Sequence, residues 1–247
     1  MDGFLLAFGF LTVIPVPFVA LRPGGMGRAA VWFPLVGLVV GAVSAGVAWG
    51  SLAVWHDRGV AAALVLAANL LLTGGLHLDG FMDTGDAFFS HRDRDRMLEI
   101  MKDSRAGALG VASGVVLLLA KFASVSALLA ASGRLPLILL ALAPVVGRTS
   151  MVLAALFPSA RPSGLGASFA GDVRRGHAAL ALAIGAALAA GAGAARGAAL
   201  LGLGVVVGLG GGLYWRRRLG GLTGDIYGAI NEGTELAALL AAAALLR

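Results

Sequence analysis

The chain has 247 residues, of which 59% are hydrophobic and only 13% carry a formal charge. Soluble domains are nearer to a quarter charged, so this composition excludes an ordinary soluble protein and predicts a polytopic membrane protein. The absence of cysteine excludes disulfides, thiol chemistry and cysteine metal sites. The net charge of +6 does not indicate nucleic-acid binding, because basic residues in membrane proteins mostly set the topology.

The predicted elements form one all-α domain, residues 1–247, with about six to seven transmembrane helices. Residues 4–20 are apolar, but Pro15 and Pro17 break a helix there, so we expect an interfacial or re-entrant segment. A final apolar helix, residues 236–246, is too short to span unless it begins earlier in the polar segment before it. The predicted spans are residues 30–55, 59–76, 107–130, 135–156, 177–195 and 197–213.

Charged segments connect these spans and predict the orientation. Residues 91–105 form the longest charged run and predict a cytoplasmic amphipathic helix whose apolar side chains face inward or into the lipid interface: Met97, Leu98, Ile100 and Met101. A Gly/Ser/Pro-rich loop follows at residues 157–176. With residues 91–105 in the cytoplasm, thirteen Lys and Arg side chains share that side, against three or four on the other.

Three aspartates follow the second predicted span. Asp79, Asp83 and Asp86 stand at i, i+4 and i+7, within roughly 60° of each other on a helix. Oxygen ligands on a rigid helix suit Mg²⁺, especially Mg²⁺ shared with a phosphate. The spacing alone fits a magnesium site and a solvated helix face equally well, and the apolar surroundings favour the magnesium site.

A second acidic group lies near the end of the chain. Asp225 and Glu232, seven residues apart, share a helix face, and Glu235 lies roughly 60° further round. Taken alone, these acids are better explained as a favourable helix N-terminus. Because the topology places both acidic groups at one membrane face, we expect them to converge on a two-metal or metal–phosphate site.

Two cations interrupt apolar spans, where charge is costly and indicates a function. Lys121 is close to mid-span and is expected to pair with a buried carboxylate or to reach a substrate anion. Arg148 lies about two turns from the cytoplasmic end of its helix, so it either snorkels to the interface or holds a substrate phosphate. His77 opens the acidic stretch as a base or a hydrogen-bonding group.

Five segments of the sequence resemble the cobalamin synthase, or adenosylcobinamide-GDP ribazoletransferase, family. They cover both ends and the middle of the chain: F-L-T-V-I-P-V-P at 10–17, F-P-L-V-G at 33–37, G-G-L-H-L-D-G-F-M-D-T-G-D at 74–86, R-M-L-E-I-M-K-D-S-R-A-G-A-L-G at 96–110 and T-G-D-I-Y-G-A-I-N-E at 223–232. The third and fourth are long and specific. The Ala/Gly-rich residues 157–213 carry little of the resemblance.

The resemblance implies an integral inner-membrane enzyme of late cobalamin synthesis that requires Mg²⁺. Such an enzyme joins adenosylcobinamide-GDP to α-ribazole, or to its 5′-phosphate, and releases GMP. Association with other enzymes of the late pathway is a further expectation.

The residues fit this chemistry, in which a ribose hydroxyl attacks a phosphorus of a pyrophosphate. We expect Asp79, Asp83 and Asp86 to hold Mg²⁺ against the pyrophosphate. Asp225 and Glu232 are expected to hold a second metal ion, or one of them accepts the hydroxyl proton. The cations are expected to stabilise negative charge on the phosphoryl group or the leaving GMP: Arg148 and Lys121.

Three other interpretations compete with this one. The acidic motif is similar in chemistry to that of CDP-alcohol phosphotransferases, but their D-x-x-D-G-x-x-A-R opening is absent, since Gly80 directly follows Asp79. A cation-coupled transporter also carries acids in membrane helices, although here they gather at one face. A scaffold for other corrin enzymes is the least favoured.

Overall fold

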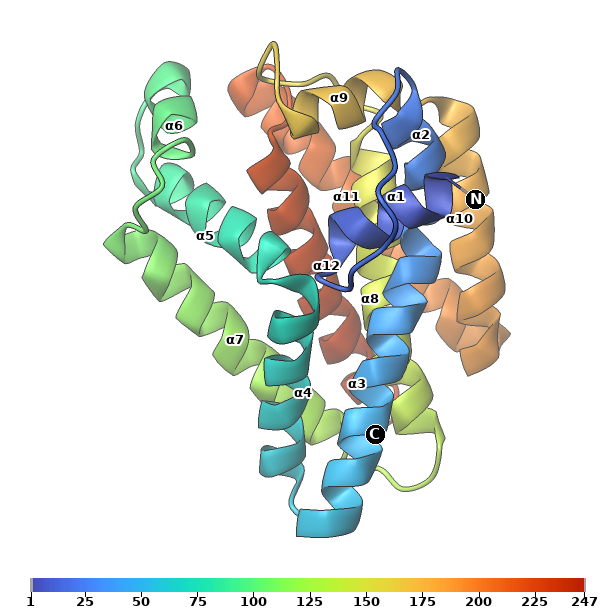
Figure 1. Ribbon diagram of the computed structural model, residues 1–247. Helices are drawn as coiled ribbons and strands as arrows, with labels where there is room; N and C mark the ends of the chain where they lie inside the picture. Colours follow the sequence, from blue (N-terminus) through green and yellow to red (C-terminus); the bar gives the residue numbers. More distant parts are fainter. Residues whose placement is uncertain (1, 247) are drawn as a thin grey trace.

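Helices are the dominant secondary structure of the computed structural model, which describes residues 2–246 (Figure 1). The α-helices are α1 Asp2–Leu11, α2 Gly25–Ala30, α3 Phe33–Trp55, α4 Arg58–Thr73, α5 Leu76–Phe89, α6 Arg94–Ile100, α7 Ala108–Leu128, α8 Leu135–Ala154, α9 Leu165–Asp172, α10 Arg175–Ala189, α11 Ala194–Leu219 and α12 Gly224–Ala244. A short 3₁₀ turn, η1 Ala190–Ala192, separates α10 from α11. No β-sheet occurs within residues 2–246, which confirms the all-α fold class.

The bundle is built around α8, which is buried along most of its length. Helices α3, α10, α11 and α12 pack against it, and α4, α5 and α7 complete the bundle on the other side of α3 and α12 (Figure 1). A helix with apolar residues on all sides belongs in such a central place, because its neighbours shield every face. Arg148 is the one charged residue of α8, and its side chain is buried as well.

Among the described residues, five helices are long and apolar enough to cross a membrane: α3, α7, α8, α10 with η1, and α11. The pair α4 and α5 makes a sixth, broken span with a bend of 94°. Helix α12 has 21 residues and begins at Gly224, so the last helix does start within the polar segment. The chain is therefore a membrane-embedded helical bundle, as the sequence predicts.

Three local predictions need correction. The charged run 91–105 forms only the seven-residue helix α6. Asp93 caps the start of this helix by accepting a hydrogen bond from Arg96 N, and the helix ends at its C-cap, Met101. In the loop that follows α6, Arg105 donates hydrogen bonds to the exposed Asp103 carboxylate, and these bonds lower the pKa of that carboxyl to about 2. The loop 157–176 contains helix α9, and the break between α10 and α11 falls at η1 and not at Arg196.

The bend between α4 and α5 comes from two consecutive glycines. Gly74 and Gly75 have φ angles of 61° and 70°, in the left-handed region that glycine adopts without steric cost. Helix α4 is 16 residues long, roughly 24 Å, so it stops short of a bilayer core of about 30 Å. The bend therefore sends the acidic helix α5 sideways across the bundle instead of out of it.

The two ends of the bundle differ in charge. One end carries α2, α6, α9 and the C-terminal end of α11, whose last turn holds Arg216, Arg217 and Arg218 (Figure 1). These elements and their adjoining loops contain most of the basic residues. The α3–α4 and α7–α8 turns lie at the opposite end. The basic residues that the sequence assigns to one side of the membrane thus lie at one end of the bundle.

The contact between α3 and α8 gives a first prediction. A Cβ added to Gly37 would lie 2.6 Å from the Pro144 carbonyl oxygen, whereas nothing lies within 4 Å of one added to Gly46. We expect Gly37→Ala to lower the free energy of unfolding by roughly 1–3 kcal/mol through overpacking. Gly46→Ala, on the lipid side of the same helix, is the matched control and should leave it unchanged or slightly raised. Thermal unfolding in detergent measures both, and equal midpoints for the two variants would contradict the packing argument.

Candidate active site

The acidic stripe lies on one helix, as predicted, and a fourth aspartate from another helix lies beside it. Asp79, Asp83 and Asp86 all lie on α5, and the Asp83 carboxyl is subject to the charges of Asp79, Asp225 and Asp86. This fourth aspartate is Asp225, which lies in the first turn of α12. Glycine makes the approach possible, because a Cβ on Gly80 would lie 2.9 Å from the Asp225 Cα. The structure therefore places Asp225 of α12 beside the α5 stripe, where its charge and that of Asp79 both act on Asp83.

Asp86 has a different neighbourhood. Its carboxylate accepts hydrogen bonds from the backbone N–H groups of Gly107 and Gly110, both at 2.7 Å. These groups open helix α7, whose first N–H groups have no partner within the helix. Asp86 thus caps α7 from a neighbouring helix, and this role occupies both of its oxygens.

Asp225 has a cationic neighbour that the sequence did not single out. Arg161 Nη2 lies 3.4 Å from Asp225 Oδ2, and Thr223 Oγ1 donates to the same oxygen at 3.1 Å. The loop carrying Arg161 is fixed to the start of α12 by two backbone hydrogen bonds, from Leu222 N to Pro158 O and from Ala160 N to Leu222 O. The only sequence signal for Arg161 was its place in a loop on the side of both acidic groups.

A cavity of about 170 Å³ opens between these elements. Asp79 and Asp225 line it on one side together with His77. The remaining lining is apolar, aromatic or glycine: Phe10, Leu76, Gly80, Met151, Leu165, Gly166, Phe169, Gly224, Tyr227 and Gly228. Gly228 allows α12 to approach α5, since a Cβ there would lie 2.9 Å from the His77 carbonyl oxygen.

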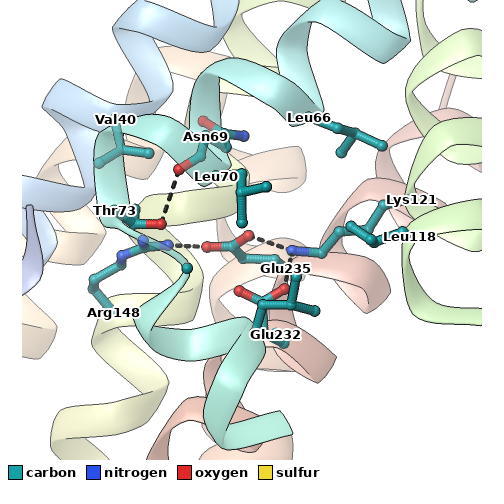
Figure 2. Close-up of a pocket in the computed structure, with 12 residues that line it drawn as sticks. Val40, Leu66, Asn69, Leu70, Thr73, Leu118, Lys121, Arg148, Glu232 and Glu235 are labelled. Carbon is teal, nitrogen blue, oxygen red and sulfur yellow. Dashed lines mark hydrogen bonds and ion pairs between the residues drawn. The ribbon is translucent and has the colours of Figure 1, made fainter. Parts of the chain in front are cut away.

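The other predicted charged residues form a separate buried network (Figure 2). Lys121 Nζ donates to Glu232 Oε2 and to Glu235 Oε2, both at 2.6 Å. Arg148 pairs with the second oxygen of Glu235, which also accepts from Asn231 Nδ2 at 3.1 Å. Two cations and two carboxylates thus balance within the bundle, as buried charges require.

This network decides two of the alternatives left by the sequence. Lys121 does pair with buried carboxylates. Arg148 does not snorkel, because its side chain is 2% exposed and faces Glu235. Glu232 lies seven residues along α12 from Asp225, roughly 10 Å at 1.5 Å per residue, so the structure separates these two predicted metal ligands.

His77 lies between the two groups. Its Nδ1 is 3.5 Å from Arg148 Nη2, on the side of the ion network. Its Nε2 is buried and has no hydrogen-bond partner within residues 2–246, and the residue lines the cavity beside Asp79. His77 therefore connects the buried network with the acidic cavity.

The fold and this site define a class: a polytopic α-helical membrane protein that holds a carboxylate-lined cavity inside its bundle. Comparison with known families identifies it further. The cobalamin-5-phosphate synthase family matches residues 3–243, so the chain belongs to that family. This confirms the family predicted from the five sequence segments.

Individual relatives agree. The chain is 41% identical over 235 residues to the adenosylcobinamide-GDP ribazoletransferase of Roseiflexus sp. strain RS-1, covering 94% of this chain and 86% of the relative. It is 41% identical over 247 residues to that of Klebsiella pneumoniae subsp. pneumoniae, covering 98% and 99% of the two chains. The enzyme of that name from Brevibacillus brevis is 35% identical over 242 residues, 97% of each chain. No solved structure matches the chain.

Proposed function

We propose that this protein joins adenosylcobinamide-GDP to α-ribazole, or to its 5′-phosphate, and releases GMP. The observation that carries the proposal is the pair of carboxylates from two helices, Asp79 and Asp225, that line one cavity beside Asp83, in a chain whose relatives bear the name of this transferase. Carboxylates from separate helices at one cavity are suited to phosphoryl transfer, which depends on positioning and charge neutralisation.

The reaction exchanges one bond to phosphorus for another. A ribose hydroxyl oxygen bonds to the phosphorus that carries the cobinamide, and the bond from that phosphorus to the bridging pyrophosphate oxygen breaks. GMP leaves with that oxygen and its electron pair. The hydroxyl proton passes to a base, and Asp225 and His77 are the predicted acceptors that line the cavity. Glu232 is the third predicted proton acceptor, and its carboxylate is paired with Lys121.

Magnesium stays a proposal that the donor chemistry supports. Within residues 2–246 no three His, Asp or Glu side chains are already gathered closely enough to hold a metal ion. Asp79, Asp83 and Asp225 nevertheless supply the oxygen donors that Mg²⁺ prefers, and this metal commonly takes phosphate oxygens and water for its remaining ligands. Mg²⁺ bound there would neutralise charge on the pyrophosphate. Asp86 and Glu232, also predicted as ligands, would have to release their present partners first.

The cations divide into two groups under this proposal. Arg161 lies beside Asp225, and we propose that its guanidinium contacts a phosphate oxygen there. Lys121 and Arg148 are engaged with Glu232 and Glu235, and we propose that they position His77 and α12 instead of contacting the phosphoryl group.

The charge difference between the two ends of the bundle favours a site facing the cytoplasm from the bacterial inner membrane. Association with other enzymes of late cobalamin synthesis stays a prediction.

Purified protein in detergent should release GMP from adenosylcobinamide-GDP only when α-ribazole and Mg²⁺ are both present. EDTA should abolish release, and added Mg²⁺ should restore it, because charge neutralisation is lost and regained. Release that persists in EDTA would contradict the metal assignment alone. Absence of release from monodisperse protein, together with turnover of a CDP-alcohol donor, would replace the proposed function with its nearest rival.

A further inference from the structure

One wall of the acidic cavity is not explained by phosphate chemistry. It consists of aromatic rings held in fixed positions. Phe169 stacks on Phe33 at 5.3 Å between ring centroids, and it meets Tyr227 edge to face at 5.0 Å. Phe10 also stacks on Phe33, at 6.1 Å between ring centroids. Such a layered arrangement fixes the ring planes, so the wall offers a preformed aromatic surface to a ligand.

Two polar atoms of residues that line the cavity have no partner. The hydroxyl of Tyr227 and the Nε2 of His77 are buried and make no hydrogen bond within residues 2–246. Both residues are only 2% exposed, and both line the cavity. Buried polar atoms in native proteins are almost always paired, so two unpaired atoms at one cavity point to a bound ligand that pairs with them.

The cavity thus combines three features. It has aromatic lining residues, two unpaired polar atoms and two carboxylates, Asp79 and Asp225. A dry cavity of about 150 Å³ is known to hold benzene in another protein. A volume of about 170 Å³ therefore accommodates one ring of a flat aromatic base.

We propose that this cavity binds the base of the acceptor nucleoside, so that a ribose hydroxyl lies toward Asp79 and Asp225. This inference rests on the proposed function. The base of α-ribazole is a methylated benzimidazole with one free ring nitrogen and apolar edges. The Tyr227 hydroxyl suits that nitrogen, and His77 Nε2 suits a ribose hydroxyl.

The guanine of the donor fits this wall less well. Guanine presents several donors and acceptors around its edges, including O6, N7 and the exocyclic amino group. A site for it needs several matched polar groups, because every polar atom left unpaired in a buried site weakens binding. Besides the two carboxylates, the described part of the cavity offers the Tyr227 hydroxyl and His77 Nε2, while Leu76, Met151 and Leu165 add apolar surface. The observations therefore favour the acceptor base.

Leu165 provides the test, since it lines the cavity yet is 57% exposed at the start of α9. Leu165→Trp places a larger ring in the cavity without disturbing the core. Leu180→Trp is the matched control, because Leu180 is 56% exposed on α10 and away from the cavity. Tyr227→Phe removes one hydroxyl and keeps the ring.

We expect Leu165→Trp to raise the KM for α-ribazole by about tenfold or more, the equivalent of about 1.4 kcal/mol of binding. Tyr227→Phe should raise it by roughly five- to tenfold, the loss of one hydrogen bond. The KM for adenosylcobinamide-GDP should stay within about twofold in both variants, and Leu180→Trp should match the wild type.

Each other outcome has a definite meaning. A raised KM for the donor with an unchanged KM for α-ribazole would assign the cavity to guanine and overturn the inference. Unchanged KM values for both substrates in both cavity variants would overturn it as well. Absence of wild-type turnover would instead defeat the proposed function, and with it the inference. Gel filtration and thermal unfolding of each variant ensure that altered kinetics come from folded protein.

Discussion

The Asp83→Asn variant is expected to fold and insert like the wild type and to lose roughly two to three orders of magnitude in turnover. A loss of this size is typical when one charge-stabilising group is removed from an active site. Folding should survive because Asn has nearly the same shape. In addition, the Asp83 carboxyl is repelled by Asp79, Asp225 and Asp86, so removing its charge relieves repulsion. The measurement is GMP release at saturating substrates, with gel filtration and thermal unfolding for the fold.

Asp57→Asn is the matched control for this experiment. Asp57 caps helix α4 at the opposite end of the bundle by accepting a hydrogen bond from Val60 N at 2.8 Å. Asn caps helices about as well as Asp, so this variant makes the same chemical change without harming the helix. It should keep wild-type turnover. Near-normal turnover of Asp83→Asn would show that the acidic stripe is not part of the active site.

Much of the fold can be predicted from local patterns in the sequence. Long apolar runs predict most of the spans, because in lipid a helix satisfies its own backbone hydrogen bonds. The glycine pair at 74–75 is visible in the sequence, but its effect is not, since two glycines are compatible with a helix end, a kink or a loop. Only packing in the bundle selects the bend of 94° that turns α5 across it.

The candidate site is predictable in its residue types but not in its partnerships. The stripe of Asp79, Asp83 and Asp86 follows from helical spacing, yet spacing cannot show that Asp86 caps α7. Asp225 and Glu232 share a helix face, but spacing cannot show that Glu232, two turns further along the axis, pairs with Lys121.

Other residues of the site carry no local signal. Arg161 and Phe169 lie in a segment that the sequence describes only as a loop, and Tyr227 reads as an ordinary apolar residue of α12. Their place at the cavity depends on contacts between elements far apart in the chain, such as the pairing of residues 158–160 with Leu222. Helical periodicity contains no information about such contacts.

The ion network gives the last prediction. Lys121→Met leaves two buried carboxylates, Glu232 and Glu235, with only Arg148 to balance them. Breaking a buried ion pair by removing one partner typically costs about 3–5 kcal/mol of unfolding free energy, because the remaining charge is buried and uncompensated. We therefore expect this variant to unfold at a clearly lower temperature in detergent. Lys102→Met, at an exposed position outside the spans, is the matched control and should not change the midpoint.

The double variant Lys121→Met with Glu232→Gln distinguishes a structural role of Lys121 from a direct one. It restores the balance of charge, since Arg148 then faces Glu235 alone. Stability should recover most of the loss, and turnover should return to within about tenfold of the wild type, because no substrate contact has been removed. A double variant that is stable but inactive would show that Lys121 reaches the substrate. One that is less stable than both single variants would show that charge balance is not what holds these helices together.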